Sequence, residues 1–194
     1  MHHSTAPDRL TPGDTALLVI DVQEKLVPKI AGADAVVRNT AFLIDACKVL
    51  GVPVLATEQY PKGLGPTVPE LAARLPANRP EKLAFSSCAV PAVVDSFRAG
   101  RPKALLAGIE THVCVMQTAL DLLAMGIRVF LPVDALGSRY RIDHDTAIQR
   151  MREAGAVLVT SEMAVFELTG VAGTPQFKEI SRLVQERMKS ITEA

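Results

Sequence analysis

The feature that most constrains the fold is a repeated alternation between short apolar runs and longer segments with helical spacing. The apolar runs cover residues 15–20, 53–56, 103–109, 127–133 and 156–160. Helical spacing follows over residues 33–50, from about residue 113, over 143–153 and in the tail over 174–190. Apolar strands that alternate with helices are typical of a parallel sheet covered by helices on both faces. We therefore predict a three-layer α/β/α, Rossmann-like fold with a central, mostly parallel sheet of about six strands.

One stretch interrupts this pattern, because residues 61–80 contain five prolines and two glycines. Such a composition disfavours a long helix or a central strand. We expect a short helix, a large loop and a further strand near residues 82–85. A chain of 194 residues with 48% hydrophobic side chains can bury one substantial core. The sequence therefore predicts a flexible N-terminal segment over residues 1–12 and a single domain over residues 13–194.

The composition argues against several classes of partner. The 21 basic and 21 acidic residues balance, so neither nucleic acid nor an anionic membrane is expected as the main partner. No apolar run reaches the roughly 18–20 residues of a membrane-spanning helix. The N-terminus lacks the apolar core of a secretory signal. Cys47, Cys88 and Cys114 form neither a close metal-binding pair nor an even disulfide set. We expect a cytoplasmic protein with reduced thiols, and organellar import is left open.

Polar residues follow three of the predicted strands at the point where each strand ends. Asp21 follows the first strand, residues 57–60 follow the second, and residues 110–114 follow the third. In parallel sheets, ligands bind at this edge. If a helix begins near Val113, Cys114 lies in its first turn, where free N–H groups favour a nucleophilic thiolate. From spacing alone, however, a small apolar residue of a buried helix is the simpler interpretation of Cys114.

Three sequence blocks in order resemble the isochorismatase-like cysteine hydrolases, a superfamily that includes nicotinamidases, N-carbamoylsarcosine amidase and isochorismatase. The blocks are "ALLVIDVQ" (16–23), "EKLAFSS" (81–87) and "GIETHVCV" (108–115). A further block, "ATEQYPKGLGPTVPEL" (56–71), is similar in particular to isochorismatase-domain proteins and their bacterial relatives. The resemblance implies a catalytic set of Asp21, Lys82 and Cys114. It also implies a cis peptide bond between Ile109 and Glu110, and an oxyanion hole formed by the backbone N–H groups of Glu110 and Cys114.

The activity implied by this resemblance is hydrolysis of a small amide, carbamoyl or ureido compound through a thioester on Cys114. A homo-oligomer is also expected, and no cofactor. Isochorismatases that cleave a vinyl ether generally lack the nucleophilic cysteine, so its presence favours amide-type hydrolysis. The alternative is a binding or scaffold protein of the same fold that has lost turnover.

No catalytic metal is expected. The nicotinamidase branch carries Asp-Trp-His-Pro after the second strand, whereas residues 58–61 of this chain read Glu-Gln-Tyr-Pro. The chain has four histidines, and two of them are His2 and His3. His112 and His144 alone would make a poor metal site.

Several other residues are candidates for contact with a substrate or a partner. The tentative substrate pocket comprises Gln23, Tyr60 and Thr111, although Gln23 could equally cap the next helix. Arg139 and Arg141 could bind a substrate carboxylate or could simply be solvated. The remaining expectations are a structural role for His112, an oligomer contact for Tyr140, a core position for Cys47 and no role for Cys88.

Overall fold

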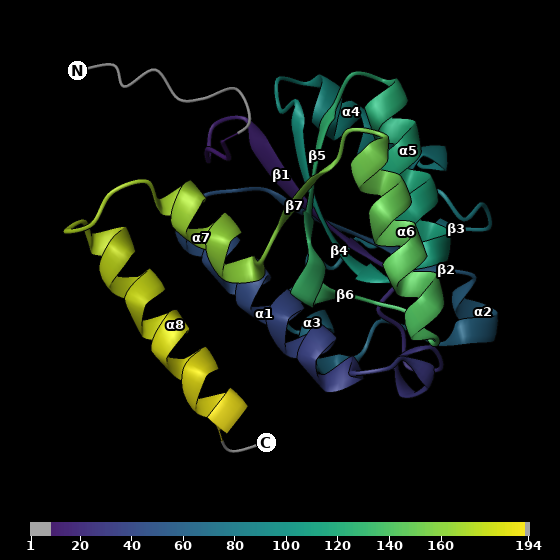
Figure 1. Ribbon diagram of the computed structural model, residues 1–194, viewed down its shortest axis with the longest axis horizontal. Helices are drawn as coiled ribbons and strands as arrows, with labels where there is room; N and C mark the ends of the chain where they lie inside the picture. Colours follow the sequence, from purple (N-terminus) through teal and green to yellow (C-terminus); the bar gives the residue numbers. More distant parts are fainter. Residues whose placement is uncertain (1–8, 193–194) are drawn as a thin grey trace.

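The computed structural model describes residues 9–192 and has a central sheet with helices on both faces (Figure 1). Its strands are β1 (Thr15–Ile20), β2 (Val54–Gln59), β3 (Glu81–Lys82), β4 (Lys103–Ile109), β5 (Arg128–Pro132), β6 (Leu136–Gly137) and β7 (Val157–Val159). The strand order is β3-β2-β1-β4-β5-β7, and β6 pairs with β4. Every pairing between these strands is parallel. The predicted three-layer α/β/α fold is confirmed.

The longer helices divide between the two faces of the sheet. The helices are α1 (Ala33–Val49), α2 (Pro61–Leu64), α3 (Pro69–Ala72), α4 (Pro91–Arg98), α5 (Met116–Ala124), α6 (Arg141–Glu153), α7 (Ser161–Thr169) and α8 (Pro175–Thr192). Helices α1, α7 and α8 cover one face, and α4, α5 and α6 cover the other (Figure 1). Leu17 and Val19 of β1 pack into the first core, whereas Ala16, Leu18 and Ile20 pack into the second. This alternation explains why β1 reads as a continuous apolar run.

The structure differs from the predicted boundaries mainly around the third strand. The strand expected near residues 82–85 is limited to Glu81–Lys82. Beyond it the chain curls, because the carbonyls of Ala84 and Phe85 both accept hydrogen bonds from the Lys82 ammonium. Leu83 is consequently 77% exposed instead of packing in the sheet.

Helices α4 and α7 and strand β6 lie outside the predicted pattern, and helix α6 has a different start. The two-residue strand β6 was not predicted, and it is too short to leave an apolar run in the sequence. Helix α6 begins at Arg141, two residues before the expected start at Asp143, which lies in its first turn.

The N-terminal segment is described only from residue 9 onward, so most of the predicted flexible segment (residues 1–8) lies outside the described residues. The described part contacts the domain. Leu10 is fully buried, and its N–H donates to Glu167 Oε2 at 3.0 Å. Lys103 Nζ donates to the carbonyl of Arg9 at 2.6 Å. Residues 9 and 10 are therefore held between β4 and α7.

A close approach of β1 and β4 shapes the carboxyl edge of the sheet. Gly108 has a φ of +127°, and a Cβ built on it would lie 2.1 Å from the carbonyl oxygen of Ile20. Only glycine fits at such a position. Because Asp21 follows Ile20, this approach brings the end of β1 against the start of the segment that leads to Cys114.

No helix within residues 9–192 is long and apolar enough to cross a membrane.

Candidate active site

Asp21 begins the site at the end of β1. Its side chain is fully buried, and its φ of +53° is unusual for a residue other than glycine. The Asp21 N–H donates to the carbonyl of Thr57 at 3.2 Å, and Thr57 Oγ1 donates to Asp21 Oδ1 at 2.8 Å. The neighbouring strand β2 therefore fixes both the backbone and the carboxylate of Asp21. Strained backbone of this kind is often found at functional sites.

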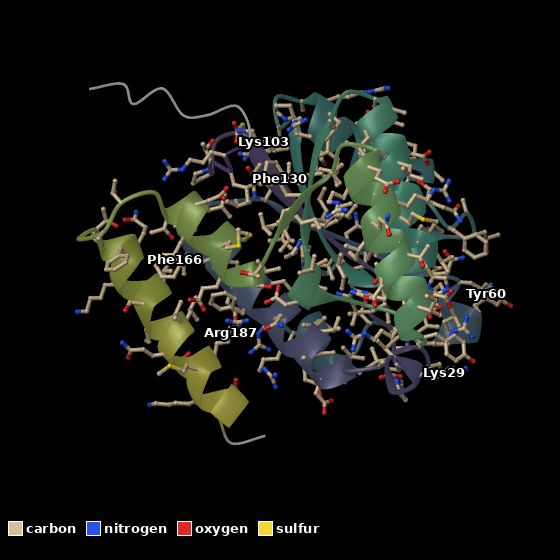
Figure 2. All side chains as sticks on the ribbon, viewed as in Figure 1. Lys29, Tyr60, Lys103, Phe130, Phe166 and Arg187 are labelled. Carbon is tan, nitrogen blue, oxygen red and sulfur yellow. The ribbon has the colours of Figure 1, made fainter. Side chains whose placement is uncertain are left out.

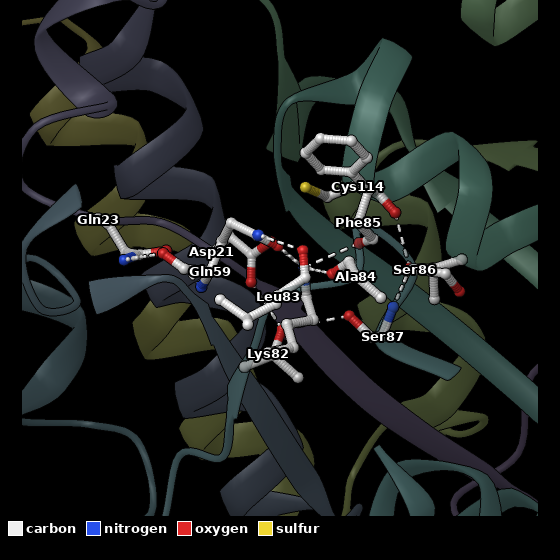
Figure 3. Close-up of polar contacts among 12 residues, drawn as sticks. Asp21, Gln23, Gln59, Lys82, Leu83, Ala84, Phe85, Ser86, Ser87 and Cys114 are labelled. Atoms are coloured by element: carbon white, nitrogen blue, oxygen red, sulfur yellow. Dashed lines mark hydrogen bonds and ion pairs between the residues drawn. The ribbon is translucent and has the colours of Figure 1, made fainter. Parts of the chain in front are cut away.

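Lys82 forms a buried ion pair with Asp21 (Figure 3). Its Nζ donates to Asp21 Oδ2 at 2.6 Å and to Gln59 Oε1 at 2.7 Å. The carbonyls of Phe85 and Ala84 accept from the same nitrogen at 2.8 and 3.3 Å. The exposed fraction is 1% for the Lys82 side chain and 0% for that of Asp21. Because the ammonium has polar partners on several sides, its burial is compensated.

Cys114 lies in a π-helical turn, Thr111–Val115, that directly precedes α5. The helix was expected to begin near Val113, and it begins two residues earlier. The thiol is buried, and it lies close enough to the Asp21 carboxylate and the Lys82 ammonium for both groups to act on its pKa. The structure therefore brings together Asp21, Lys82 and Cys114, which come from the ends of β1, β3 and β4 (Figure 3).

The protonation of this cluster is governed by burial. Burial raises the pKa of the Cys114 thiol to about 12, the negative charge of Asp21 raises it too, and the positive charge of Lys82 opposes both. Burial also raises the pKa of Asp21, against the ion pair with Lys82 and the hydrogen bonds from Cys114 and Thr57. The resting sulfur is therefore a neutral thiol at neutral pH. This differs from the thiolate that the position at a helix start suggested, because burial and the negative charge of Asp21 both disfavour the charged sulfur.

The segment between β4 and the π-helical turn contains the Ile109–Glu110 peptide bond, which is cis. The carbonyl of Glu110 accepts hydrogen bonds from the N–H groups of Val113 and Val115 at 3.1 and 3.2 Å. The oxyanion hole assigned to the N–H groups of Glu110 and Cys114 stays a prediction.

The polar atoms of the Gln23 side chain are all bound by the protein itself. Its side chain is fully buried, and Nε2 donates to the carbonyls of Gln59 at 3.0 Å and Gly65 at 2.6 Å. Its Oε1 accepts the N–H of Gln59 at 2.7 Å. The next helix, Val27–Lys29, has no side-chain cap, so Gln23 does not cap it, and a substrate contact for Gln23 stays a prediction. Gln23 joins the end of β1 to the end of β2 and to the loop that follows α2.

The other two tentative pocket residues differ in exposure. Thr111 is fully buried, and its hydroxyl is hydrogen-bonded to His144 Nδ1 of α6 at 2.9 Å, so a substrate contact for Thr111 stays a prediction. Tyr60 is 51% exposed, and its N–H donates to the Lys82 carbonyl at 3.0 Å. A substrate contact for Tyr60 stays a prediction.

The remaining candidate residues take part in protein contacts. His112 Nδ1 is hydrogen-bonded to Ser138 Oγ at 3.0 Å, in keeping with a structural role. Cys47 is fully buried in the core, and Cys88 is half-buried. Within residues 9–192, no three or more possible ligands gather in a way that could hold a metal ion.

Thr57 and Gln59 bind the Asp21–Lys82 pair directly, but the sequence analysis gave neither of them a role. They donate to Asp21 and accept from Lys82, respectively. The signal for them was present, because both lie in the polar run at the end of β2, next to β1. Their partners, however, depend on which strands are neighbours in the sheet.

Comparison with known proteins agrees with this architecture. Residues 15–163 match the family model of the isochorismatase domain. The chain is 44% identical over 181 residues to isochorismatase domain-containing protein 2A of Mus musculus, which covers 92% of this chain and 86% of that protein.

Two solved structures are also similar. The MAR1 ribonuclease of Caenorhabditis elegans superimposes with a TM-score of 0.87 at 42% identity, covering 91% of this chain and 92% of the other. The ycaC gene product of Escherichia coli, described as an octameric hydrolase of unknown specificity, gives a TM-score of 0.85 at 27% identity, with 98% of both chains covered.

The parallel sheet, with a buried Asp–Lys pair and a cysteine at its carboxyl edge, defines a protein of a hydrolase-like class. The chain belongs to the isochorismatase family.

Proposed function

We propose that this protein is a cysteine hydrolase that cleaves the C–N bond of a small amide, carbamoyl or ureido compound. The observation that carries the proposal is the buried Asp21–Lys82 pair, 2.6 Å apart, within reach of the Cys114 thiol. Burying two charges costs desolvation free energy, which only close pairing and further hydrogen bonds offset. A base, a cation and a sulfur nucleophile at one strand edge are the groups that acyl transfer through sulfur requires.

In the first half of the reaction, Cys114 Sγ transfers its proton to Asp21 and forms a bond to the substrate carbonyl carbon. The electron pair of the C=O double bond moves to the oxygen, where the N–H groups of Glu110 and Cys114 would stabilise it. The raised pKa of Asp21 makes it a stronger base for this step. When the C–N bond breaks, the leaving nitrogen takes the proton from Asp21, and a thioester remains on Cys114.

In the second half, a water molecule attacks the thioester carbonyl and gives a proton to Asp21. The C–S bond then breaks, the sulfur takes the proton back from Asp21, and the carboxylic or carbamic acid is released. The Lys82 ammonium stabilises the negative charge that alternates between the Asp21 carboxylate and the sulfur. No step requires a metal ion, and we propose a metal-independent reaction.

The relatives suggest two further properties. The octameric assembly of the E. coli protein supports a homo-oligomer here. The ribonuclease name of the C. elegans protein supports including RNA among the compounds tested, although the balanced charge of this chain favours a small molecule. We propose a cytoplasmic location, with which the three free cysteines agree.

A binding or scaffold protein of the same fold is the second candidate function. The observation in its favour is the burial of Cys114, which is 6% exposed; burial raises the pKa of its thiol, and a neutral thiol is a weak nucleophile until a base removes its proton.

The test is a panel of primary amides, N-carbamoyl compounds, ureas and RNA, followed by detection of ammonia or amine release and of RNA cleavage. Acid-quenched samples are weighed by intact-protein mass spectrometry to trap an acyl group on Cys114. We expect turnover of one or more small compounds and its loss by on the order of 10³-fold or more in Cys114→Ala. Cys88→Ala is the matched control, because it removes a half-buried thiol outside the site.

RNA cleavage that survives in Cys114→Ala, with no ammonia or amine released from any small compound, would contradict the proposal. Binding of a compound without release or an acyl adduct would favour the binding protein.

A further inference from the structure

The segment that leads to Cys114 runs alongside a second segment, residues 136–144. Strand β6 pairs with the end of β4, so that Gly108 lies opposite Leu136 and Ile109 opposite Gly137. After β4 the chain continues into the π-helical turn, and after β6 it continues into α6. The two segments therefore stay adjacent where the nucleophile is positioned.

Successive residues of the nucleophile segment are each bound by this second segment. Glu110 pairs with Arg139, Thr111 is hydrogen-bonded to His144 at 2.9 Å, and His112 to Ser138 at 3.0 Å. We name these three side-chain pairs the clamp. It accounts for the polar residues in "GIETHVCV", which the three proposed catalytic residues leave unexplained.

The Glu110–Arg139 pair is the charged part of the clamp. A single carboxylate oxygen, Glu110 Oε1, accepts both the backbone N–H of Arg139 at 3.1 Å and its Nε–H at 3.0 Å. The exposed fraction is 9% for the Glu110 side chain and 48% for that of Arg139. The buried member is thus the carboxylate, which depends on Arg139 for its compensating charge. The carbonyl of Glu110 in turn accepts the N–H groups of Val113 and Val115, on either side of Cys114.

We propose that Arg139 is a positioning residue, which fixes the π-helical turn through Glu110 and so places the Cys114 sulfur against Asp21. This inference rests on the proposed function of the same site. Arg139 acts through Glu110 and not on the substrate, so its effect is measurable without any substrate. This separates the proposal from the alternative that Arg139 binds a substrate carboxylate.

The experiment compares the full-length protein with Arg139→Ala, Arg139→Lys and Glu110→Gln. Alkylation of Cys114 by iodoacetamide is followed against pH by peptide mass spectrometry, which separates Cys114 from Cys47 and Cys88. Hydrogen exchange is measured on peptides that cover residues 110–116 and, for reference, β1 and α8. Arg141→Ala is the matched control. It removes the same charge only two residues along the chain, and the Arg141 side chain is 91% exposed.

We expect Arg139→Ala to speed both exchange in residues 110–116 and alkylation of Cys114 at pH 8, each about tenfold, because a looser turn admits water to the thiol. Arg139→Lys should restore much of the slow alkylation, since it keeps the cation, whereas both variants keep the backbone N–H of residue 139. Glu110→Gln should fall between the two, and Arg141→Ala should match the unaltered protein.

Arg139→Ala with unchanged alkylation and unchanged exchange in residues 110–116 overturns the inference, even if its melting temperature falls. If Arg139→Ala has no effect but Asp21→Asn does alter Cys114 alkylation, only this inference fails and the proposed function stands. If Asp21→Asn has no effect either, the coupling of Asp21 to Cys114 fails, and with it both proposals.

Discussion

Two charged clusters tie distant parts of this chain together, and they differ in depth and in content. At the carboxyl edge of the sheet, Asp21 and Lys82 are almost completely buried beside a thiol. On the opposite side of α1, Arg187 of α8 points toward α1 (Figure 2), where its Nε donates to Asn39 Oδ1 at 2.9 Å. Its terminal nitrogens donate to Asp134 and Glu162, both at 3.0 Å.

The comparison teaches what distinguishes a candidate site from a structural network. The Arg187 cluster stays partly open to solvent, since the exposed fractions of its acidic partners are 25% and 47%. The Arg187 guanidinium also lies 5.2 Å from the centroid of the Phe42 ring, so it binds an aromatic side chain of α1 as well as the two carboxylates. The Asp21–Lys82 cluster lies beside the thiol of Cys114, a group that can act as a nucleophile. A charge pair marks a site only when it is buried with a reactive group.

The largest expected effect is on stability at the buried pair. Lys82→Met should lower the free energy of unfolding by about 3–5 kcal/mol, because it leaves the Asp21 carboxylate buried without its cation. Urea denaturation followed by circular dichroism measures this change. The double variant Lys82→Met with Asp21→Asn is the control, since it removes both charges and should recover a large part of the loss. Equal losses in the two variants would mean that the charge itself matters little.

The approach of β1 to β4 gives the next effect. Gly108→Ala should destabilise the protein by about 3 kcal/mol, because its Cβ would meet the Ile20 carbonyl and its φ of +127° disfavours alanine. Thermal and urea unfolding provide the measurement. Gly100→Ala is matched to it, with a φ of +99° and nothing within 4 Å of the added Cβ. Similar losses at Gly108 and Gly100 would show that the contact with β1 is unimportant.

A smaller effect is expected at the second cluster. Arg187→Ala should cost about 2 kcal/mol of stability, since it removes hydrogen bonds to two carboxylates that are only partly buried. The rate of Cys114 alkylation should stay unchanged, which is the property that separates this cluster from the site. A slowed or accelerated alkylation in this variant would break the distinction between the two clusters.

The smallest effect concerns the protonation of the thiol. With a pKa of about 12, the thiolate fraction of Cys114 should rise tenfold per pH unit between pH 7 and 10, without a plateau. Asp21→Asn removes a negative charge that raises this pKa, so alkylation of Cys114 at pH 8 should accelerate on the order of tenfold. Cys47, whose thiol pKa is also raised to about 12 by burial alone, is the internal reference and should not respond. A plateau below pH 9 in the unaltered protein would contradict the neutral resting thiol.

Much of the fold could be predicted because its strands are buried on both faces. Such strands leave continuous apolar runs, and the polar residues that end them at Asp21 and at residues 110–114 mark the carboxyl edge. The resemblance then singled out Lys82, whose own strand is too short to leave a pattern. Thus the position of the site followed from physical arguments, and its chemistry from the family.

What could not be predicted depends on contacts between distant residues. The polar bonds of Gln23 lead to Gln59 and Gly65, and nothing near Gln23 in the sequence indicates them. The cluster of Arg187 likewise joins residues 39, 134, 162 and 187 across the whole domain. The protonation of Cys114 depends on burial, which only the packed structure determines.

The curl of the chain around Lys82 also makes its amine a reporter. With 1% of its side chain exposed, Lys82 is shielded from amine-reactive reagents unless residues 83–85 move away. The rate at which such a reagent labels Lys82, relative to the surface lysines, therefore measures how often this edge of the sheet opens. Lys82, the cation of the site, therefore also reports the local opening of the site.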